Sequence, residues 1–256
     1  MQLRAVPAFA DNYIWMLADD AGDAVLVDPG DAAAAEAALH HHQLRLRAIL
    51  VTHHHADHIG GIAALLQAHS TVRVLAPDDA RIHGDWPRVT HGQQVELAQP
   101  RLTLHVLALP GHTRSHVAYH CAPWLFCGDA LFSLGCGRLF EGTADDLLTS
   151  MRRISALPDD SLIAPAHEYT LANAAFACAV EPDNADLQAR VQQARAQRAD
   201  GAPTLPVSLA SERACNPFLR WQTPAVRAWG RRQGMDGDDP AALLGLLRGA
   251  KDAFRA

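Results

Sequence analysis

One short run of the chain, from Thr52 to His58, concentrates the side chains best suited to bind metal. A tight loop can aim four of them at one point: His53, His55, Asp57 and His58. Imidazole nitrogens and carboxylate oxygens are ligands for zinc, iron or manganese. Four ligands so close in sequence exceed what one ion takes from one loop. The run therefore predicts two ions, with His53 and His55 on the first and Asp57 and His58 on the second.

Three later residues share a second pattern, in which an apolar strand and a small residue precede a possible ligand. They are His112, Asp129 and His167. A carboxylate has two oxygens, so Asp129 is the natural bridge between two ions. We expect His112 to complete the first site and His167 the second. Asp57 and Asp129 are the residues that we expect to take part in catalysis.

The other histidines need no metal to explain them. His40 to His42 are typical of a solvated helix end. His54 should point away from its ligating neighbours, because side chains alternate along an extended segment. His116 and His120 are expected to support the ligands or to pack rather than to bind an ion themselves.

These residues must be positioned by the elements around them. Short apolar runs bounded by turn signals predict strands, and longer segments between them predict helices. The predicted strands include residues 24–27, 48–51, 72–76, 102–109 and 124–127. The predicted helices include residues 31–44, 59–68 and 144–157. Interleaved strands and helices indicate a layered α/β or α+β domain, with the histidine run between a strand and a helix.

The rest of the chain is predicted to be helical. The expected helices cover residues 171–180, 183–199, 223–233 and 240–254, with a proline-rich connection at 201–217. We therefore predict a metal-binding catalytic domain over residues 1–168 and an α-helical substrate-binding domain over residues 169–256.

Composition limits the class of protein. The chain has 256 residues, 49% of them hydrophobic, which is enough for a packed core. No apolar run approaches the ~20 residues of a membrane-spanning helix, and no secretory signal is evident, so we expect a cytoplasmic protein. The five cysteines form no regular pattern and are expected to be reduced thiols. A net charge of -6 disfavours nucleic acid as the partner.

The metal-binding pattern, T-H-x-H-x-D-H followed by an isolated His, Asp and His, resembles that of the metallo-β-lactamase superfamily. Other stretches resemble one branch of it, the hydroxyacylglutathione hydrolases or glyoxalase II enzymes. These stretches are Asn12-Tyr13, Val27 to Gly30, Pro110 to Thr113, Cys127 to Asp129, Gly135 to Gly142, His167 to Thr170, Asn216 to Arg220 and Arg248 to Asp252. The resemblance extends over nearly the whole chain.

The resemblance implies an αββα sandwich with the metals at one edge, followed by a smaller α-helical domain that closes over the substrate. It implies a monomer that binds two divalent ions, and zinc is expected in preference to iron or manganese. The implied reaction is hydrolysis of S-D-lactoylglutathione to D-lactate and glutathione by a metal-bridging hydroxide, the second step of methylglyoxal detoxification. The implied substrate contacts are Arg138, Phe140, His167, Tyr169, Arg248 and Lys251.

Four positions depart from the family pattern. Ser115 and Ala166 stand where glycine is usual, and Arg138 and Phe140 where many relatives carry lysine and some carry tyrosine. The first two bear on loop geometry, and the last two on contacts to the glycine end of glutathione.

A thioester suits this set of residues. A thiolate, with a thiol pKa near ~8.5, leaves without a general acid, and water bound to metal supplies hydroxide near neutral pH. The carboxylates of glutathione require cationic partners. Arg248 and Lys251, the only lysine of the chain, would share one helix face.

Other functions compete with this one. One alternative is another hydrolase of the superfamily, such as a lactonase. A second is a mononuclear iron persulfide dioxygenase, which would not need Asp57, His58 and His167. A purely structural metal site would favour cysteine ligands. A nuclease would be expected to carry a basic stripe.

Overall fold

The computed structural model describes residues 1–255, which form two compact units. The first unit contains residues Met1–Ala108 and Ser115–Gly128. The second contains Leu109–Arg114 and the chain from Asp129 onward.

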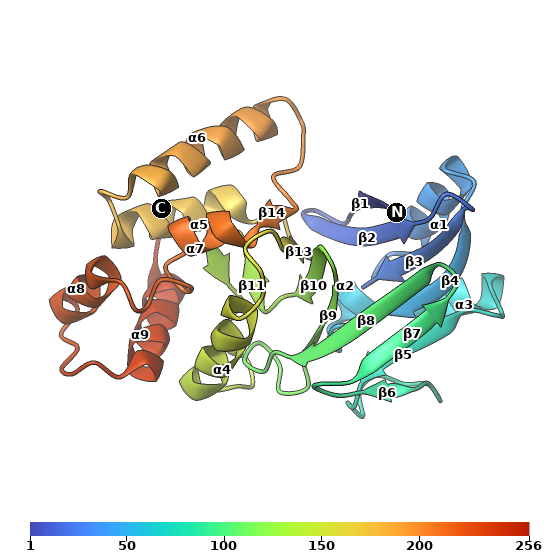
Figure 1. Ribbon diagram of the computed structural model, residues 1–256, viewed down its shortest axis with the longest axis horizontal. Helices are drawn as coiled ribbons and strands as arrows, with labels where there is room; N and C mark the ends of the chain where they lie inside the picture. The colour runs from blue at the N-terminus through green and yellow to red at the C-terminus, as the bar shows by residue number, and fades with distance from the viewer. Residues whose placement is uncertain (256) are drawn as a thin grey trace. The chain divides into compact units, whose positions relative to one another are not determined.

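The first unit contains a six-stranded sheet in the order β1-β2-β3-β4-β5-β6 (Figure 1). Its strands are β1 (Gln2–Ala8), β2 (Asn12–Ala18), β3 (Asp23–Val27), β4 (Arg45–Leu50), β5 (Arg73–Pro77) and β6 (Arg88–Val89). The first three strands pair antiparallel, and β3 to β6 pair parallel. The ends of parallel strands share one edge of a sheet, so Asp28 after β3 and Thr52 after β4 lie together there.

Three helices accompany this sheet: α1 (Ala32–His41), α2 (Ala56–Ile59) and α3 (Ile62–Ala68). Buried side chains of the strands and of α1 and α3 form one apolar core, which includes Ile14, Leu26, Leu39, Ile49 and Leu65. Burying such side chains contributes about 1.5 to 3 kcal/mol each relative to exposure. The core fixes the end of β4, from which the histidine run continues.

A second set of strands in the first unit pairs antiparallel in the order β7-β8-β9-β10. They are β7 (Gln94–Ala98), β8 (Arg101–Ala108), β9 (Val117–Cys121) and β10 (Trp124–Gly128). The buried Tyr119 hydroxyl donates to the carbonyl oxygens of Val51 and Leu75 at 2.9 and 3.1 Å. This contact joins β9 to the end of β4 and to the middle of β5.

The second unit is mainly helical. Its helices are α4 (Ala144–Ser155), α5 (Thr170–Val180), α6 (Ala185–Ala199), α7 (Leu209–Cys215), α8 (Pro224–Arg232) and α9 (Pro240–Ala253). Its strands are the hairpin β11 (Leu131–Phe132) and β12 (Gly135–Cys136), and the antiparallel pair β13 (Leu162–Pro165) and β14 (Val207–Ser208). Helix α4 packs on α9, and α6 packs on both α5 and α7.

Two local predictions differ from the structure. The helix predicted at residues 59–68 is broken into α2 and α3 at Gly60 and Gly61. The Gly61 N–H donates to the Pro29 carbonyl oxygen at 3.0 Å, and a Cβ at Gly61 would clash with that oxygen. The proline-rich connection at 201–217 contains α7, which begins after Ser208. The mixed α/β organisation with a helical C-terminal part is confirmed, while the boundary at residue 168 stays a prediction.

All five cysteines are free thiols, and only Cys178 is not buried. Burial raises the pKa of Cys121 to about 12 and that of Cys215 to about 11. Burial also raises the pKa of Cys136, against the opposing charge of Arg248. Within residues 1–255, none of the helices has the length and apolar character needed to cross a membrane.

Candidate metal centre

The histidine run of the first unit is held by Asp28. The Asp28 carboxylate accepts hydrogen bonds from the Thr52 backbone N–H at 2.7 Å and from the Thr52 hydroxyl at 2.6 Å. The same carboxylate lies 3.0 Å from Nδ1 of His58. A carboxylate on one ring nitrogen fixes the orientation of an imidazole and makes the other nitrogen a better ligand. Asp28 therefore presents Nε2 of His58 for binding.

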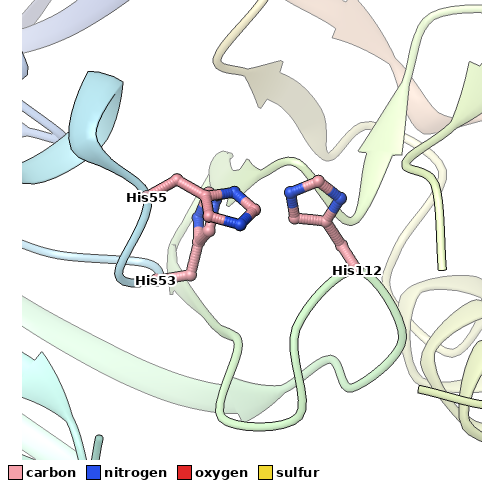
Figure 2. A group of neighbouring side chains, drawn as sticks. All are labelled: His53, His55 and His112. Atoms are coloured by element: carbon pink, nitrogen blue, oxygen red, sulfur yellow. The ribbon is translucent and has the colours of Figure 1, made fainter. Parts of the chain in front are cut away.

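The four candidate ligands of this run converge in pairs. Nε2 of His53 lies 2.9 Å from Nδ1 of His55, and Figure 2 shows the two rings together on the loop after β4. Nε2 of His58 lies 3.5 Å from Oδ2 of Asp57. His53 and His58 also offer ligand atoms within 4.8 Å of each other. The side-chain amide of Asn12 donates to Oδ2 of Asp57 at 3.0 Å, which holds this carboxylate in place.

The second unit brings the other three candidates together around Asp129. Oδ2 of Asp129 lies 3.5 Å from Nε2 of His112, and Oδ1 lies 3.3 Å from Nε2 of His167. The two oxygens of one carboxylate thus face different histidines. This is the arrangement expected of a bridging ligand.

The loop after β12 orients His112, whose ring is also labelled in Figure 2. Nδ1 of His112 lies 3.0 Å from the Arg138 carbonyl oxygen, which can only accept, so Nδ1 carries the proton and Nε2 carries the lone pair. A Cβ at Gly137 would clash with the Asp129 carbonyl oxygen and would lie 3.1 Å from Nδ1 of His112. Glycine is therefore required where the backbone passes the two ligands.

The donor chemistry in each unit fits a divalent metal ion. Nitrogen and carboxylate oxygen atoms of buried or half-buried side chains face one another at 2.9 to 3.5 Å. Like-charged or lone-pair-bearing groups at these distances are stabilised by a shared cation. The thiol-free donor set is compatible with zinc, iron or manganese.

Two predicted substrate contacts lie beside these ligands in the second unit. The Tyr169 ring stacks on His167 with 4.7 Å between centroids and 7° between planes. The Phe140 ring meets His112 edge to face at 5.2 Å, and 62% of the Phe140 residue is exposed. An exposed aromatic ring beside a ligand histidine offers an apolar surface to a substrate.

The three predicted cationic contacts gather around α9. Arg248 is buried, and its Nη1 donates to the Cys136 carbonyl oxygen at 2.6 Å. Nη2 of Arg248 and Nε of Arg138 lie 3.0 and 3.4 Å from the same Asp252 oxygen. Lys251 is half-buried, with Nζ 5.9 Å from the Phe176 ring centroid. Burial, aided by the charge of Arg248, lowers the pKa of Lys251.

Comparison with known proteins decides the family. Residues 10–167 match the model of the metallo-β-lactamase superfamily, and residues 168–254 match that of the hydroxyacylglutathione hydrolase C-terminus. The chain is 54% identical over 257 residues to the hydroxyacylglutathione hydrolase of Stenotrophomonas maltophilia (strain R551-3), with all of both chains covered. The chain belongs to the hydroxyacylglutathione hydrolase family. It is also 48% identical to the hydroxyacylglutathione hydrolase of Xanthomonas euvesicatoria, again with both chains covered in full.

Solved structures agree with the fold of this hydroxyacylglutathione hydrolase family member. The crystal structure of ETHE1 from Myxococcus xanthus is 25% identical with a TM-score of 0.65, and the match covers 99% of each chain. That of TTHA1623 in a di-iron-bound form is 26% identical with a TM-score of 0.55 and covers 64% of this chain and 91% of that one. The predicted resemblance and the metallo-β-lactamase-type fold are confirmed.

The sequence did not reveal two carboxylates that support the candidate ligands. Asp28 lies in the Val27 to Gly30 stretch, and its position at the end of a parallel strand is the signal that could have revealed its role. Asp79 had no such signal. It accepts from the Ser115 hydroxyl at 2.5 Å, binds Arg81 at 2.7 Å and lies 3.6 Å from Nδ1 of His54. His54 is thus turned toward Asp79.

His116 also contributes through packing. Its buried ring stacks on His53 with centroids 4.8 Å apart and 23° between planes. This contact limits the rotation of the His53 ring.

Proposed function

We propose that this protein hydrolyses S-(2-hydroxyacyl)glutathione thioesters, with S-D-lactoylglutathione giving D-lactate and glutathione. The observation that carries the proposal is full-length similarity, at 54% identity, to a protein named hydroxyacylglutathione hydrolase. The facing metal-capable side chains within each unit support it. The reaction would be the second step of methylglyoxal detoxification.

The proposed cofactor is a pair of divalent ions, with zinc as the first choice. His53, His55 and His112 would hold one ion, and Asp57, His58 and His167 the other, with Asp129 shared. When bound, two such ions supply a nucleophile from water at neutral pH and stabilise negative charge on the acyl oxygen. Asp28 would keep His58 in its binding orientation, and the Arg138 carbonyl would do the same for His112.

In the proposed reaction, an oxygen–carbon bond forms between water and the acyl carbon, and the carbon–sulfur bond breaks. The electron pair of that bond leaves on sulfur as a thiolate. One proton of the attacking water goes to solvent as the new bond forms, and the carboxylic acid produced loses the other. A thiolate is a good leaving group near neutral pH, so no side chain has to protonate the sulfur. This fits a set of residues that supplies ligands and cations rather than a general acid.

The glutathione moiety would be held in the second unit. Arg248 and Lys251 would bind the glycine carboxylate, since guanidinium and ammonium groups are the natural partners of a carboxylate. Tyr169 would hydrogen-bond the peptide part through its hydroxyl, and Arg138 and Phe140 would line the same region. We further propose a monomer with no nucleic-acid partner, in keeping with the net charge of -6.

Steady-state assays on three substrates test this function. S-D-lactoylglutathione, a simple lactone and a β-lactam would be compared on one preparation whose metal content has been measured. We expect kcat/KM for the thioester to exceed the other two by more than about 100-fold, because a site built for polar groups discriminates strongly against compounds that lack them. Equal or greater activity on the lactone would contradict the proposal.

A further inference from the structure

The β11–β12 hairpin of the second unit has a strained turn. Ser133 and Leu134 connect the two strands, and both are buried. Leu134 has a φ of 61°, in the left-handed region that residues with a side chain rarely adopt. Such a conformation persists only where the surroundings hold it.

Three buried polar side chains hold this turn, and we call them the hairpin clamp: Glu212 and Asn216 of the α7 region and Asn173 of α5. The Glu212 carboxylate accepts from the Leu134 N–H at 2.9 Å and from the Ser133 hydroxyl at 2.8 Å. The Asn173 amide donates to the Ser133 carbonyl oxygen at 3.0 Å.

Asn216 completes the clamp from the other side of the turn. Its amide donates to the carbonyl oxygens of Phe132 and Gly135 at 3.1 and 3.0 Å, and to Glu212 at 2.9 Å. Its own oxygen accepts from the Phe218 N–H at 3.0 Å. Glu212 and Asn216 are both fully buried. The backbone groups named above therefore have buried hydrogen-bond partners in place of water. A buried network of this kind makes the turn rigid.

The hairpin is continuous with the candidate ligands of the same unit. It begins just after Asp129 and is followed by Gly137 and Arg138, whose backbone packs against Asp129 and His112. Within the hairpin, the Phe132 ring contacts His167 at 5.8 Å and Tyr169 at 5.1 Å between centroids. A shift of the hairpin would therefore move the surroundings of all three ligands.

We propose that Glu212 and Asn216 are positioning residues for the metal centre, which set the geometry of Asp129, His112 and His167 through the β11–β12 hairpin. The inference rests on the proposed metal ligands. It assigns a role to the Asn-Pro-Phe stretch at 216–218, which the proposed activity does not use directly.

The principal test is Glu212→Gln, which keeps the size of the side chain and removes one acceptor oxygen. Zinc affinity would be measured by chelator competition, and ligand geometry by the visible spectrum of the cobalt-substituted protein. We expect a 10- to 100-fold loss of zinc affinity, as is usual when an outer partner of metal ligands is removed, and a changed cobalt spectrum. The kcat should fall while KM changes by less than about 3-fold.

Glu181→Gln is the matched control. Glu181 is also a buried carboxylate of the second unit, but the partner of its two oxygens is Arg220, at 2.7 and 3.0 Å, and not the hairpin turn. This variant should lose thermal stability and keep the wild-type zinc affinity and cobalt spectrum. Ser133→Ala, which removes one hydrogen bond from the clamp, is a milder variant for use if Glu212→Gln does not fold. It should change the spectrum in the same direction with a smaller loss of affinity.

Two results would overturn the positioning role. One is a folded Glu212→Gln protein, or a folded Ser133→Ala protein in its place, with wild-type zinc affinity and cobalt spectrum. The other is an equal loss of zinc in Glu181→Gln, since the effect would then be general destabilisation. Absence of metal from the unsubstituted protein would instead refute the proposed function, and the positioning role with it.

Discussion

Substitution of Asp129 should affect the metal centre most, because its two oxygens lie 3.5 and 3.3 Å from the ring nitrogens of His112 and His167. If this carboxylate is shared by two ions, its loss weakens both together. We expect Asp129→Ala to reduce the metal content from about two ions per chain to below about one, and turnover by on the order of 1,000-fold. Elemental analysis and steady-state kinetics measure the two effects.

Asp236→Ala is a suitable control, because Asp236 is an exposed carboxylate of the same unit. It should keep full activity. A fully active wild-type enzyme with one tightly bound ion would refute the two-ion proposal.

Lys251 offers the cleaner test of glutathione binding. Arg248 is buried against the Cys136 carbonyl, so its removal would also destabilise the protein, whereas Lys251 is only half-buried. A charge-assisted hydrogen bond contributes about 1.5 to 3 kcal/mol, so Lys251→Ala should lower kcat/KM by about 10- to 150-fold, mainly through KM.

The loss should shrink for a thioester that lacks the glycine residue, because the carboxylate that Lys251 would bind is then missing. Metal content should stay at the wild-type value. Unchanged kinetics on S-D-lactoylglutathione would show that Lys251 is only a surface charge.

The low pKa of Asp79 predicts how the free energy of unfolding depends on pH. Hydrogen bonds from Arg81, opposed by burial and aided by Ser115, hold the pKa of Asp79 well below the usual range of an aspartate. A carboxyl group whose pKa is lower in the folded than in the unfolded protein stabilises the fold. This stabilisation is fully present above the pKa of the unfolded state, and it is lost as the pH falls from there toward the pKa of the folded state. The stability difference between wild type and Asp79→Asn should therefore be constant at neutral pH and shrink below about pH 4.

Urea unfolding of metal-free protein between neutral pH and pH 3 measures this difference. Asp20→Asn, in an exposed turn, should show no such trend. A difference that grows on acidification would contradict the assigned role of Asp79.

Among the helices, α4 has the clearest local signals. Thr143 caps it, with its hydroxyl accepting from the Asp146 N–H and the Asp146 carboxylate accepting from the Thr143 N–H at 2.8 Å. Loss of such a cap typically costs about 1 kcal/mol. Thr143→Ala should lower the free energy of unfolding by this amount, while Thr143→Ser should retain it. Equal stability of the two variants in urea unfolding would show that the cap contributes nothing.

Such local signals explain which elements the sequence could predict. The predicted helix at 144–157 corresponds to α4, since its cap and apolar spacing are adjacent in sequence. Helix α7 was missed, because Pro203 and Pro206 precede it and its seven residues give little periodicity. The break at Gly60 and Gly61 depends on the Pro29 carbonyl, which is distant in sequence. Contacts of that kind leave no pattern in the helix itself.

The same reasoning applies to the candidate site. The ligands could be proposed from sequence because each follows an apolar strand or lies in one run. Glu212 could not, because it meets Leu134 across 78 residues and resembles any other glutamate on a helix. Tertiary partners of this kind become visible only when the fold is known.

For the protein as a whole, bound metal should raise thermal stability. An ion that binds only the folded state adds about 2.7 kcal/mol when its free concentration is 100 times Kd. For a chain of this length, that corresponds to about 5 to 10 °C in Tm. Calorimetry before and after chelation should show the drop, and zinc but not magnesium should reverse it, since nitrogen ligands disfavour magnesium. A Tm unaffected by chelation would mean that no ion stabilises the fold.

The burial of the cysteines has a consequence for an enzyme that releases glutathione. Oxidised glutathione forms mixed disulfides only with a thiol that is accessible and partly ionised. Four of the five thiols are buried, and those of Cys121, Cys136 and Cys215 have raised pKa values, so their thiolate fraction at neutral pH is very small. Cys136 sits beside Arg248, where a glutathione adduct would occupy the space proposed for the substrate. Burial thus protects four of the five thiols from S-glutathionylation and leaves Cys178 as the position open to that reaction.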